Sequence, residues 1–155
     1  MAVNIVTGIG PRVGSSFVMQ QCKAKGLYVN GTKFLNGLLP KAGNPKGYYD
    51  VLPWEVSNIK RGIAKVWPVA LTQLQVPVNK MIILQRKSFQ DQLESCIKQA
   101  KREPIKTEFT CEEIIHMAQD YLDNWLSVND SVDHRSYYTE DLNSSIDSIV
   151  EFLGD

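Results

Sequence analysis

The sequence lacks the long apolar run that a membrane-spanning helix needs, because no window approaches about 20 uninterrupted apolar residues. Its N-terminus also lacks the basic, then apolar, then small-residue order of a secretory leader. We therefore expect no membrane partner and a cytoplasmic location. Only three cysteines occur, and none is in a CxxC spacing. This odd number predicts neither a disulfide framework nor a zinc site, but reduced and mostly buried thiols.

Acidic residues are scarce in the first two thirds of the chain. The segment through Lys106 contains 16 basic and five acidic residues, whereas the segment from Thr107 onward contains 12 acidic residues and one basic residue, Arg135. Two interpretations stay open: the two parts neutralise each other in the folded protein, or an anionic ligand binds to the N-terminal part. We expect no nucleic-acid partner, because no aromatic residue interleaves with the basic run and no recognised nucleic-acid motif is present. That run consists of Lys98, Lys101, Arg102 and Lys106.

Apolar runs alternate with amphipathic segments along the chain. The runs Val3–Val6 and Val78–Leu84 predict strands, the second suited to the middle of a parallel sheet. Apolar stripes predict helices, one of which begins with the capping-box pair Thr110 and Glu113. We expect helices at 15–22, 89–100, 110–125 and 142–153, short strands at 27–29 and 136–138, and a long loop region at 30–53.

This alternation predicts an α/β fold, a three-layer sandwich with a central, mostly parallel sheet. The length of 155 residues fits a single domain over residues 1–155. The third helix is expected to pack through one apolar stripe, composed of Ile114, Met117, Ala118, Tyr121, Leu122 and Trp125.

A glycine-rich loop between the first strand and the first helix is the arrangement in which backbone N–H groups converge on a phosphate. An ordinary nucleotide-triphosphate loop has a lysine directly after its last glycine, but here Ser15 follows Gly14. The second strand is followed by Arg86 rather than by a magnesium-binding aspartate. Both features argue against an ordinary kinase.

The hexapeptide Pro11-Arg12-Val13-Gly14-Ser15-Ser16 resembles the loop with which sulfotransferases hold the 5′-phosphosulfate of PAPS. Three further stretches are similar to sulfotransferase segments in the expected order. They are Asn44-Pro45-Lys46-Gly47-Tyr48-Tyr49-Asp50, the strand Met81–Leu84 with Arg86 and a serine on the next helix, and Tyr138-Thr139-Glu140-Asp141-Leu142 followed by Phe152-Leu153-Gly154. The resemblance implies a P-loop, sulfotransferase-like type of α/β fold.

The resemblance also implies a role for individual residues. Arg86 and Ser95 would hold the 3′-phosphate, although Ser95 lies nine residues after Arg86 where eight is commoner, so that Ser88 is the alternative. Asp50 would be the catalytic base, and Arg12 and Lys46 would neutralise developing charge. The residues that would cradle the 5′-phosphosulfate are Arg12, Val13, Gly14, Ser15 and Ser16.

Each of these roles has a plainer alternative. Asp50 fits a turn or helix-cap residue ahead of Val51 equally well, and Lys46 fits a solvated side chain. His116 and His134 do not match the position of a catalytic histidine and are expected at the surface. Four aromatic residues flank the loop region and could line an acceptor pocket, although core packing is the expected role of the tryptophans; they are Trp54, Trp67, Tyr48 and Tyr49.

The function implied by the resemblance is transfer of a sulfuryl group from PAPS to an acceptor hydroxyl or amine, with adenosine 3′,5′-bisphosphate as the product and without a metal. Two alternatives stay open. One is a nucleotide or nucleoside kinase-like enzyme with unusual loop chemistry. The other is a non-catalytic protein that keeps the fold to bind a nucleotide or a phosphate.

Overall fold

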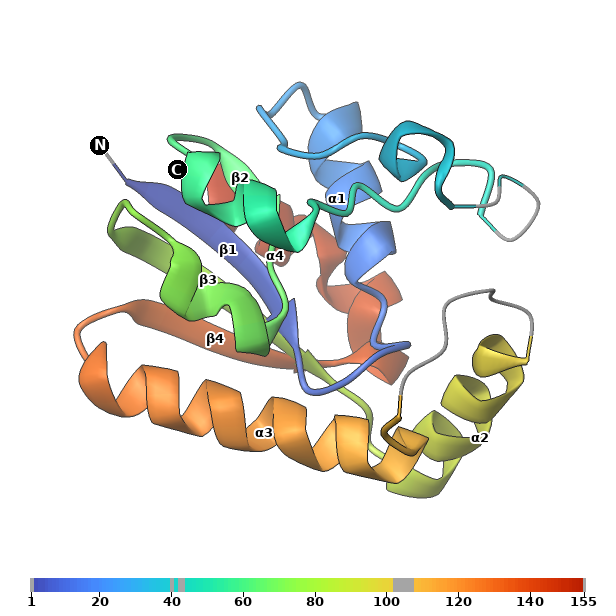
Figure 1. The fold of residues 1–155 in the computed structure, drawn as a ribbon. Coiled ribbons are helices and arrows are strands. Elements are labelled where there is room, and N and C mark those ends of the chain that lie inside the picture. Colours follow the sequence, from blue (N-terminus) through green and yellow to red (C-terminus); the bar gives the residue numbers. More distant parts are fainter. Residues whose placement is uncertain (1, 40, 42–43, 102–107, 155) are drawn as a thin grey trace.

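The computed structural model describes residues 2–39, 41, 44–101 and 108–154. A sheet of four parallel strands forms the centre, with the strand order β2-β1-β3-β4. The strands are β1 (Val3–Gly8), β2 (Ile63–Lys65), β3 (Val78–Gln85) and β4 (Asp133–Tyr138). The expected α/β fold with a parallel sheet is therefore confirmed (Figure 1).

Helices cover both faces of this sheet. On one face lie α1 (Ser15–Ala24) and α4 (Leu142–Gly154), which pack against each other, and on the other lies α3 (Cys111–Val128). The helix α2 (Phe89–Ala100) follows the carboxyl end of β3 and contacts α3 (Figure 1). Short 3₁₀ turns complete the described chain: η1 (Leu35–Gly37), η3 (Pro53–Asn58), η4 (Pro68–Gln73) and η5 (Thr139–Asp141).

The central strands β1 and β3 are apolar on both faces, as strands covered by helices on two sides must be. Val6 and Ile82 point into one core cluster together with residues of α1 and α4. Ile5 and Met81, each one position earlier, point into a second cluster together with Leu122 of α3. The alternation of side chains along a strand thus builds two cores on one sheet.

One strand was predicted in the wrong place. The expected strand at 27–29 contributes only an isolated bridge between Val29 and Ile63, whereas Ile63–Lys65 forms the edge strand β2. A run of three buried residues is too short to show a periodicity. The described residues of the expected loop region at 30–53 include the short 3₁₀ turn η1.

The stripe expected to bury α3 is only partly buried. The capping box of Thr110 and Glu113 is present, and Ile115, Leu122 and Trp125 are buried. Ile114, Met117, Ala118 and Tyr121 instead line an apolar cavity. Core packing was also the wrong prediction for Trp54, which is 71% exposed.

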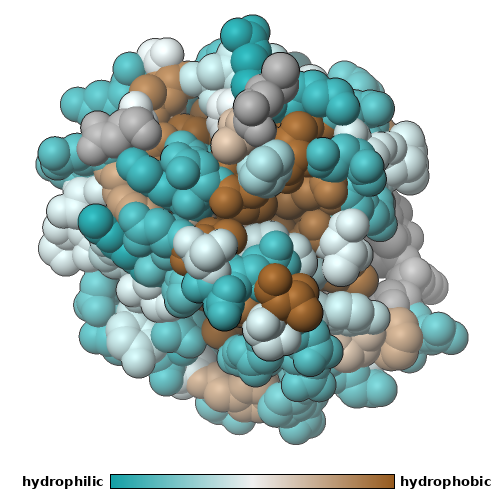
Figure 2. All heavy atoms as spheres, turned by 90° about the vertical axis from the view of Figure 1, so that its left-hand side faces the viewer, coloured by the Kyte–Doolittle hydropathy of each residue, from teal (hydrophilic) through white to brown (hydrophobic). Residues whose placement is uncertain are grey.

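Other expectations concern the surface and the thiols. Cys22 and Cys96 are buried and Cys111 is partly exposed, and burial raises the pKa of the Cys22 thiol to about 12. No helix in the described ranges is long and apolar enough to cross a bilayer. In the predicted basic run, Arg102 and Lys106 lie outside the described residues. Figure 2 shows the face at the left of Figure 1, where hydrophobic areas lie among hydrophilic ones.

Candidate functional site: an anion cavity at the carboxyl end of the sheet

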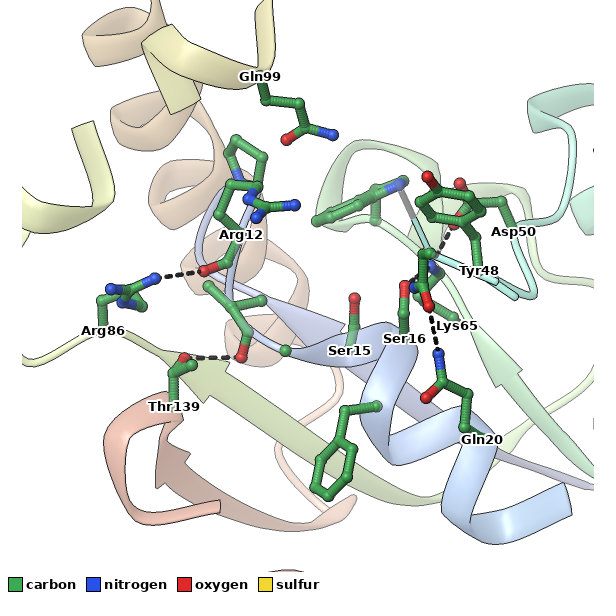
Figure 3. Close-up of a pocket in the computed structure, with 16 residues that line it drawn as sticks. Arg12, Ser15, Ser16, Gln20, Tyr48, Asp50, Lys65, Arg86, Gln99 and Thr139 are labelled. Atoms are coloured by element: carbon green, nitrogen blue, oxygen red, sulfur yellow. Dashed lines mark hydrogen bonds and ion pairs between the residues drawn. The ribbon is translucent and has the colours of Figure 1, made fainter. Parts of the chain in front are cut away.

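A cavity of about 430 Å³ opens where the loop at 9–14 and the start of α1 meet the segment at 44–50. We call it the main cavity. It lies beyond the carboxyl ends of β1 and β2, the place where parallel α/β sheets commonly bind ligands. Figure 3 shows Arg12, Arg86 and Thr139 on one side of it, Asp50, Lys65 and Tyr48 on the other, and Ser15 and Ser16 between them.

The loop at 9–14 has the backbone conformation of an anion nest. Gly10, Arg12 and Gly14 have positive φ values of 88°, 64° and 91°, and Val13 between them does not. Such alternation turns successive N–H groups toward the same side of the chain. The N–H groups of Ile9 and Gly10 already donate to the Leu84 and Gly8 carbonyls and Pro11 has none, so the nest consists of the N–H groups from Arg12 onward. A left-handed conformation costs a residue with a side chain roughly 1–2 kcal/mol, so the fold holds Arg12 in this shape against its own preference.

Gln92 of α2 holds the first half of the loop. This side chain is 3% exposed, and its Nε2 donates to the carbonyl oxygens of Ile9 and Pro11, both at 2.8 Å. A Cβ atom at Gly10 would lie 2.8 Å from the same Nε2. Gly10 therefore has to be glycine both for its positive φ and for the approach of Gln92.

Side chains that follow β3 and β4 hold the second half of the loop. Arg86 Nη1 donates to the Arg12 carbonyl at 3.0 Å, and Thr139 Oγ1 donates to the Val13 carbonyl at 2.6 Å. Arg86 Nε also pairs with Glu140 at 2.9 Å. These carbonyls are thus occupied by donors from other elements of the fold, which fixes the orientation of the peptide units between them.

Glu140 completes this support. It accepts from the Lys87 backbone N–H at 2.9 Å as well as from Arg86. Desolvation alone would raise the pKa of Glu140, but the Lys87 N–H and the Arg86 guanidinium together hold that pKa below its ordinary value. The expected 3′-phosphate ligand Arg86 therefore lines the main cavity while it supports the loop.

Gly14 ends the loop and is the N-cap of α1, without a side-chain cap. A Cβ atom there would lie 2.5 Å from Leu142 Cδ1, so this glycine allows close contact with α4. Ser15 and Ser16 occupy the first turn of α1 and line the main cavity. The N–H groups of a first helical turn have no partner within the helix and attract anions.

Val13 contributes to the loop through its backbone. Its side chain is buried in the core cluster below the loop, and a Cβ atom at Gly8 would lie 2.4 Å from Val13 Cγ2. The expected contact of Val13 with an anion can therefore come only from its N–H group.

An ion pair forms the opposite wall of the main cavity. Lys65, at the end of β2, pairs with Asp50 Oδ1, and its Nζ donates to Ser16 Oγ at 3.2 Å. The Lys65 side chain is 4% exposed and that of Asp50 is 24% exposed. Burial lowers the pKa of Lys65 from its ordinary value, while the Asp50 carboxylate acts in the opposite direction. The buried Lys65 ammonium therefore contacts the first turn of α1 through Ser16.

Hydrogen bonds from α1 hold the segment at 44–50 that carries Asp50. Gln20 of α1 donates to Asn44 Oδ1 at 3.1 Å and to the Gly47 carbonyl at 2.7 Å. Tyr49 is buried and has a φ of 59°, an uncommon value for a residue with a side chain. Lys46 is exposed and does not belong to the described residues that line the main cavity.

The two candidate serines for a 3′-phosphate have different partners. Ser95 Oγ accepts from Arg12 Nε at 3.1 Å, which places it beside the loop. Ser88 caps α2 by accepting from the Asp91 N–H at 3.1 Å. The structure therefore brings Ser95 to Arg12 and leaves Ser88 in a structural role.

No protein-family model matches the chain, and no curated protein matches it either. The resemblance to sulfotransferases therefore stays a prediction from the sequence, and the function has to be argued from the geometry of the main cavity. Within the described ranges, no three His, Cys, Asp or Glu side chains are grouped so that they could hold a metal ion. His116 and His134 are at the surface, as expected.

Several residues of the site were not predicted from the sequence, among them Lys65, Gln92 and Thr139. Lys65 could have been recognised from the sequence by one feature, its position inside the apolar run from Ile63 to Val66. Gln92 and Thr139 have no such feature, because a glutamine on a helix and a threonine before one are ordinary residues there. Their hydrogen bonds to the loop span 81 and 126 positions of sequence.

Proposed function

We propose that the main cavity binds PAPS and that the protein is a sulfotransferase-like, P-loop type transferase acting on an acceptor hydroxyl or amine. The observation that carries this proposal is the nest in the loop at 9–14, whose carbonyls are held by side chains from other elements, Gln92, Arg86 and Thr139. A loop shaped in this way is preorganised for a phosphate or sulfate group.

Two cationic regions at opposite ends of the cavity favour a nucleotide with phosphate groups at two positions. Arg12, whose Nε donates to Ser95, lines one end, and Lys65 with Ser16 lines the other (Figure 3). In the proposed arrangement the 3′-phosphate binds near Arg12 and Ser95, and the 5′-phosphosulfate lies over Gly14, Ser15 and Ser16. The residues present therefore fit such a nucleotide without a metal ion.

When bound, the nucleotide would supply a sulfuryl group, whose bond to the 5′-phosphate oxygen breaks as a bond from sulfur to the acceptor oxygen forms. Asp50 would take the proton from the acceptor hydroxyl. Lys65 and the nest would stabilise the negative charge that remains on the 5′-phosphate. Asp50 and Lys65 touch each other, so proton removal and charge stabilisation are proposed for a single corner of the cavity.

The ion pair also favours a second candidate function. The Asp50 carboxylate is already paired with the Lys65 ammonium, and this observation is what a non-catalytic nucleotide-binding protein would show. A kinase-like reaction finds no comparable support, because Ser15 stands where the phosphate-binding lysine of such enzymes is found.

Single-turnover transfer from ³⁵S-labelled PAPS to a panel of alcohols and amines separates the two candidates. A transferase should label at least one acceptor, and Asp50→Asn should lower the rate about 10²- to 10⁴-fold, the usual contribution of a general base. Circular dichroism on the same sample verifies that the variant is folded. The control is Asp133→Asn on β4, an exposed carboxylate that does not line the main cavity. Nucleotide binding without any labelled product would refute the transferase and leave the binding protein.

A further inference from the structure

A second cavity lies next to the main cavity and is almost entirely apolar. Its volume is about 250 Å³, and Pro11 and Trp67 line both cavities. The rest of its wall comes from η4 and α3, including Val69, Ile114, Met117 and Tyr121. We call it the apolar cavity. A ligand in it would lie directly beside the loop at 9–14.

The apolar cavity exists because four of the six residues of the α3 stripe stay out of the core. Val69 and Tyr121 are 55% and 42% exposed, although apolar side chains of this size gain about 1.5–3 kcal/mol each on burial. The backbone of α3 nevertheless lies close to the loop, since a Cβ atom at Gly10 would lie 3.3 Å from Ile115 Cα. The opening is therefore part of the packing of α3 against the phosphate-loop region.

The size of the apolar cavity and the chemistry of its wall select one class of ligand. Dry apolar cavities of about 150 Å³ bind benzene in other proteins, so this volume accommodates one substituted ring. Trp67 and Tyr121 offer aromatic faces and edges, and Met117 offers a sulfur atom that packs well against a ring. A sugar would leave its hydroxyl groups without partners against this wall.

The distance to the ion pair sets the position of the reacting hydroxyl. Lys65 and Trp67 are separated by one residue of extended chain, so their Cα atoms are about 7 Å apart. Asp50 pairs with Lys65 and lines the main cavity, whose wall the apolar cavity shares at Trp67. A short alkyl linker between ring and hydroxyl would let a ring beside Trp67 present that hydroxyl to Asp50.

We propose that the apolar cavity binds the ring of the acceptor, and that the acceptor is an uncharged arylalkyl alcohol. This inference rests on the proposed sulfuryl transfer. The acceptor hydroxyl loses its proton to Asp50 and gains the sulfuryl group, while the nucleotide leaves as adenosine 3′,5′-bisphosphate. Every atom of the exchange is thus supplied by the nucleotide and the alcohol.

The test compares 2-phenylethanol with glucose as acceptors for PAPS. The account predicts a kcat/KM for 2-phenylethanol at least about tenfold above that for glucose. Ala118→Phe fills the apolar cavity and should raise the KM for 2-phenylethanol about 10- to 100-fold, the loss expected when one ring is displaced. Ser127→Phe places the same ring on an exposed position of α3 and should leave the KM unchanged.

A binding measurement makes the test independent of turnover. With adenosine 3′,5′-bisphosphate bound, 2-phenylethanol should shift the amide resonances of Met117 and Ala118 and not that of Ser127. Glucose as the better acceptor, absence of those shifts, or equal effects of the two phenylalanine variants would overturn the inference. The inference would also be overturned if Ala118→Phe changed the sedimentation coefficient of the protein but not the KM for 2-phenylethanol. The cavity would then be a contact between copies of the chain. Failure to bind adenosine 3′,5′-bisphosphate would instead refute the proposed function itself.

Discussion

Asp50→Asn should destabilise the protein even though the change keeps the shape of the side chain. In the native protein the Lys65 ammonium has two partners, the Asp50 carboxylate and Ser16 Oγ. An asparagine can still accept a hydrogen bond, but it cannot neutralise the charge. The variant therefore leaves a buried cation without a counterion.

The magnitude follows from the burial of the two partners. Breaking a buried ion pair by removing one partner costs about 3–5 kcal/mol. Because the Asp50 side chain is 24% exposed, water already reaches this pair, and we expect the lower end, about 3 kcal/mol of unfolding free energy. Lys65→Met should cost less, about 1 kcal/mol, because the carboxylate that remains is the solvated partner. The double variant should lose little beyond Lys65→Met, since the two sites are coupled.

Urea unfolding at pH 7 measures these differences. With a slope of about 2 kcal/mol/M, Asp50→Asn should lower the midpoint by about 1.5 M. The unfolding free energy of this variant should rise as the pH is raised toward 10.5. The pKa of Lys65 in the folded protein is below the 10.5 of the unfolded chain. Between these two pKa values the unfolded state binds more protons than the folded state, so raising the pH favours the folded state. Equal losses for the two single variants, or stability that falls with pH in this interval, would refute the reasoning.

Three further predictions concern the loop at 9–14. Arg12→Ala should weaken binding of adenosine 3′,5′-bisphosphate roughly 10- to 100-fold in a calorimetric titration, the effect of one lost charge-assisted hydrogen bond. The control is Arg61→Ala, which should not weaken it, since the Arg61 guanidinium lies over the Tyr28 ring. Equal affinities of the two variants would contradict the assignment of Arg12. Gln92→Leu should cost about 1–3 kcal/mol in urea unfolding, because two partly buried carbonyls lose their donor. A loss under about 0.5 kcal/mol would show that the loop holds its own shape. Since the pKa of Glu140 is lowered on folding, its contribution to stability should be present above pH 4.5 and be lost as the pH falls through its folded pKa. Glu140→Gln should abolish that part of the loss of stability at acid pH. The same loss in the variant as in the parent would show that the pair with Arg86 contributes nothing.

The sequence predicts the long, periodic elements of this fold well. The strand at 78–84 and the helix at 89–100 are found within one residue of their expected ends, because the apolar period of each agrees with its packing. The edge strand β2 could not be found in this way, since three buried residues carry no period. Pairing with β1 over a sequence separation of about 60 residues defines it instead.

The residues of the candidate site were likewise predictable only where they are contiguous in the sequence. The contiguous residues of the loop, from Pro11 to Ser16, were found because glycine, serine and arginine in one hexapeptide have a known chemistry. The residues that shape that loop come from elsewhere in the chain. Lys65 is brought to the main cavity by β2 and Gln92 by α2, so both became recognisable only from the folded chain.

The measurement that tests the central claim most directly is a calorimetric titration with adenosine 3′,5′-bisphosphate, ADP, and ATP with and without magnesium. The claim is that the main cavity binds a nucleotide through a 3′-phosphate near Arg12 and Ser95 and a 5′-phosphate over the start of α1. The account predicts binding of adenosine 3′,5′-bisphosphate at least about tenfold tighter than ADP, equivalent to one charge-assisted contact, and no requirement for magnesium. Tighter binding of ATP with magnesium, or the absence of any preference for the 3′-phosphate, would contradict it.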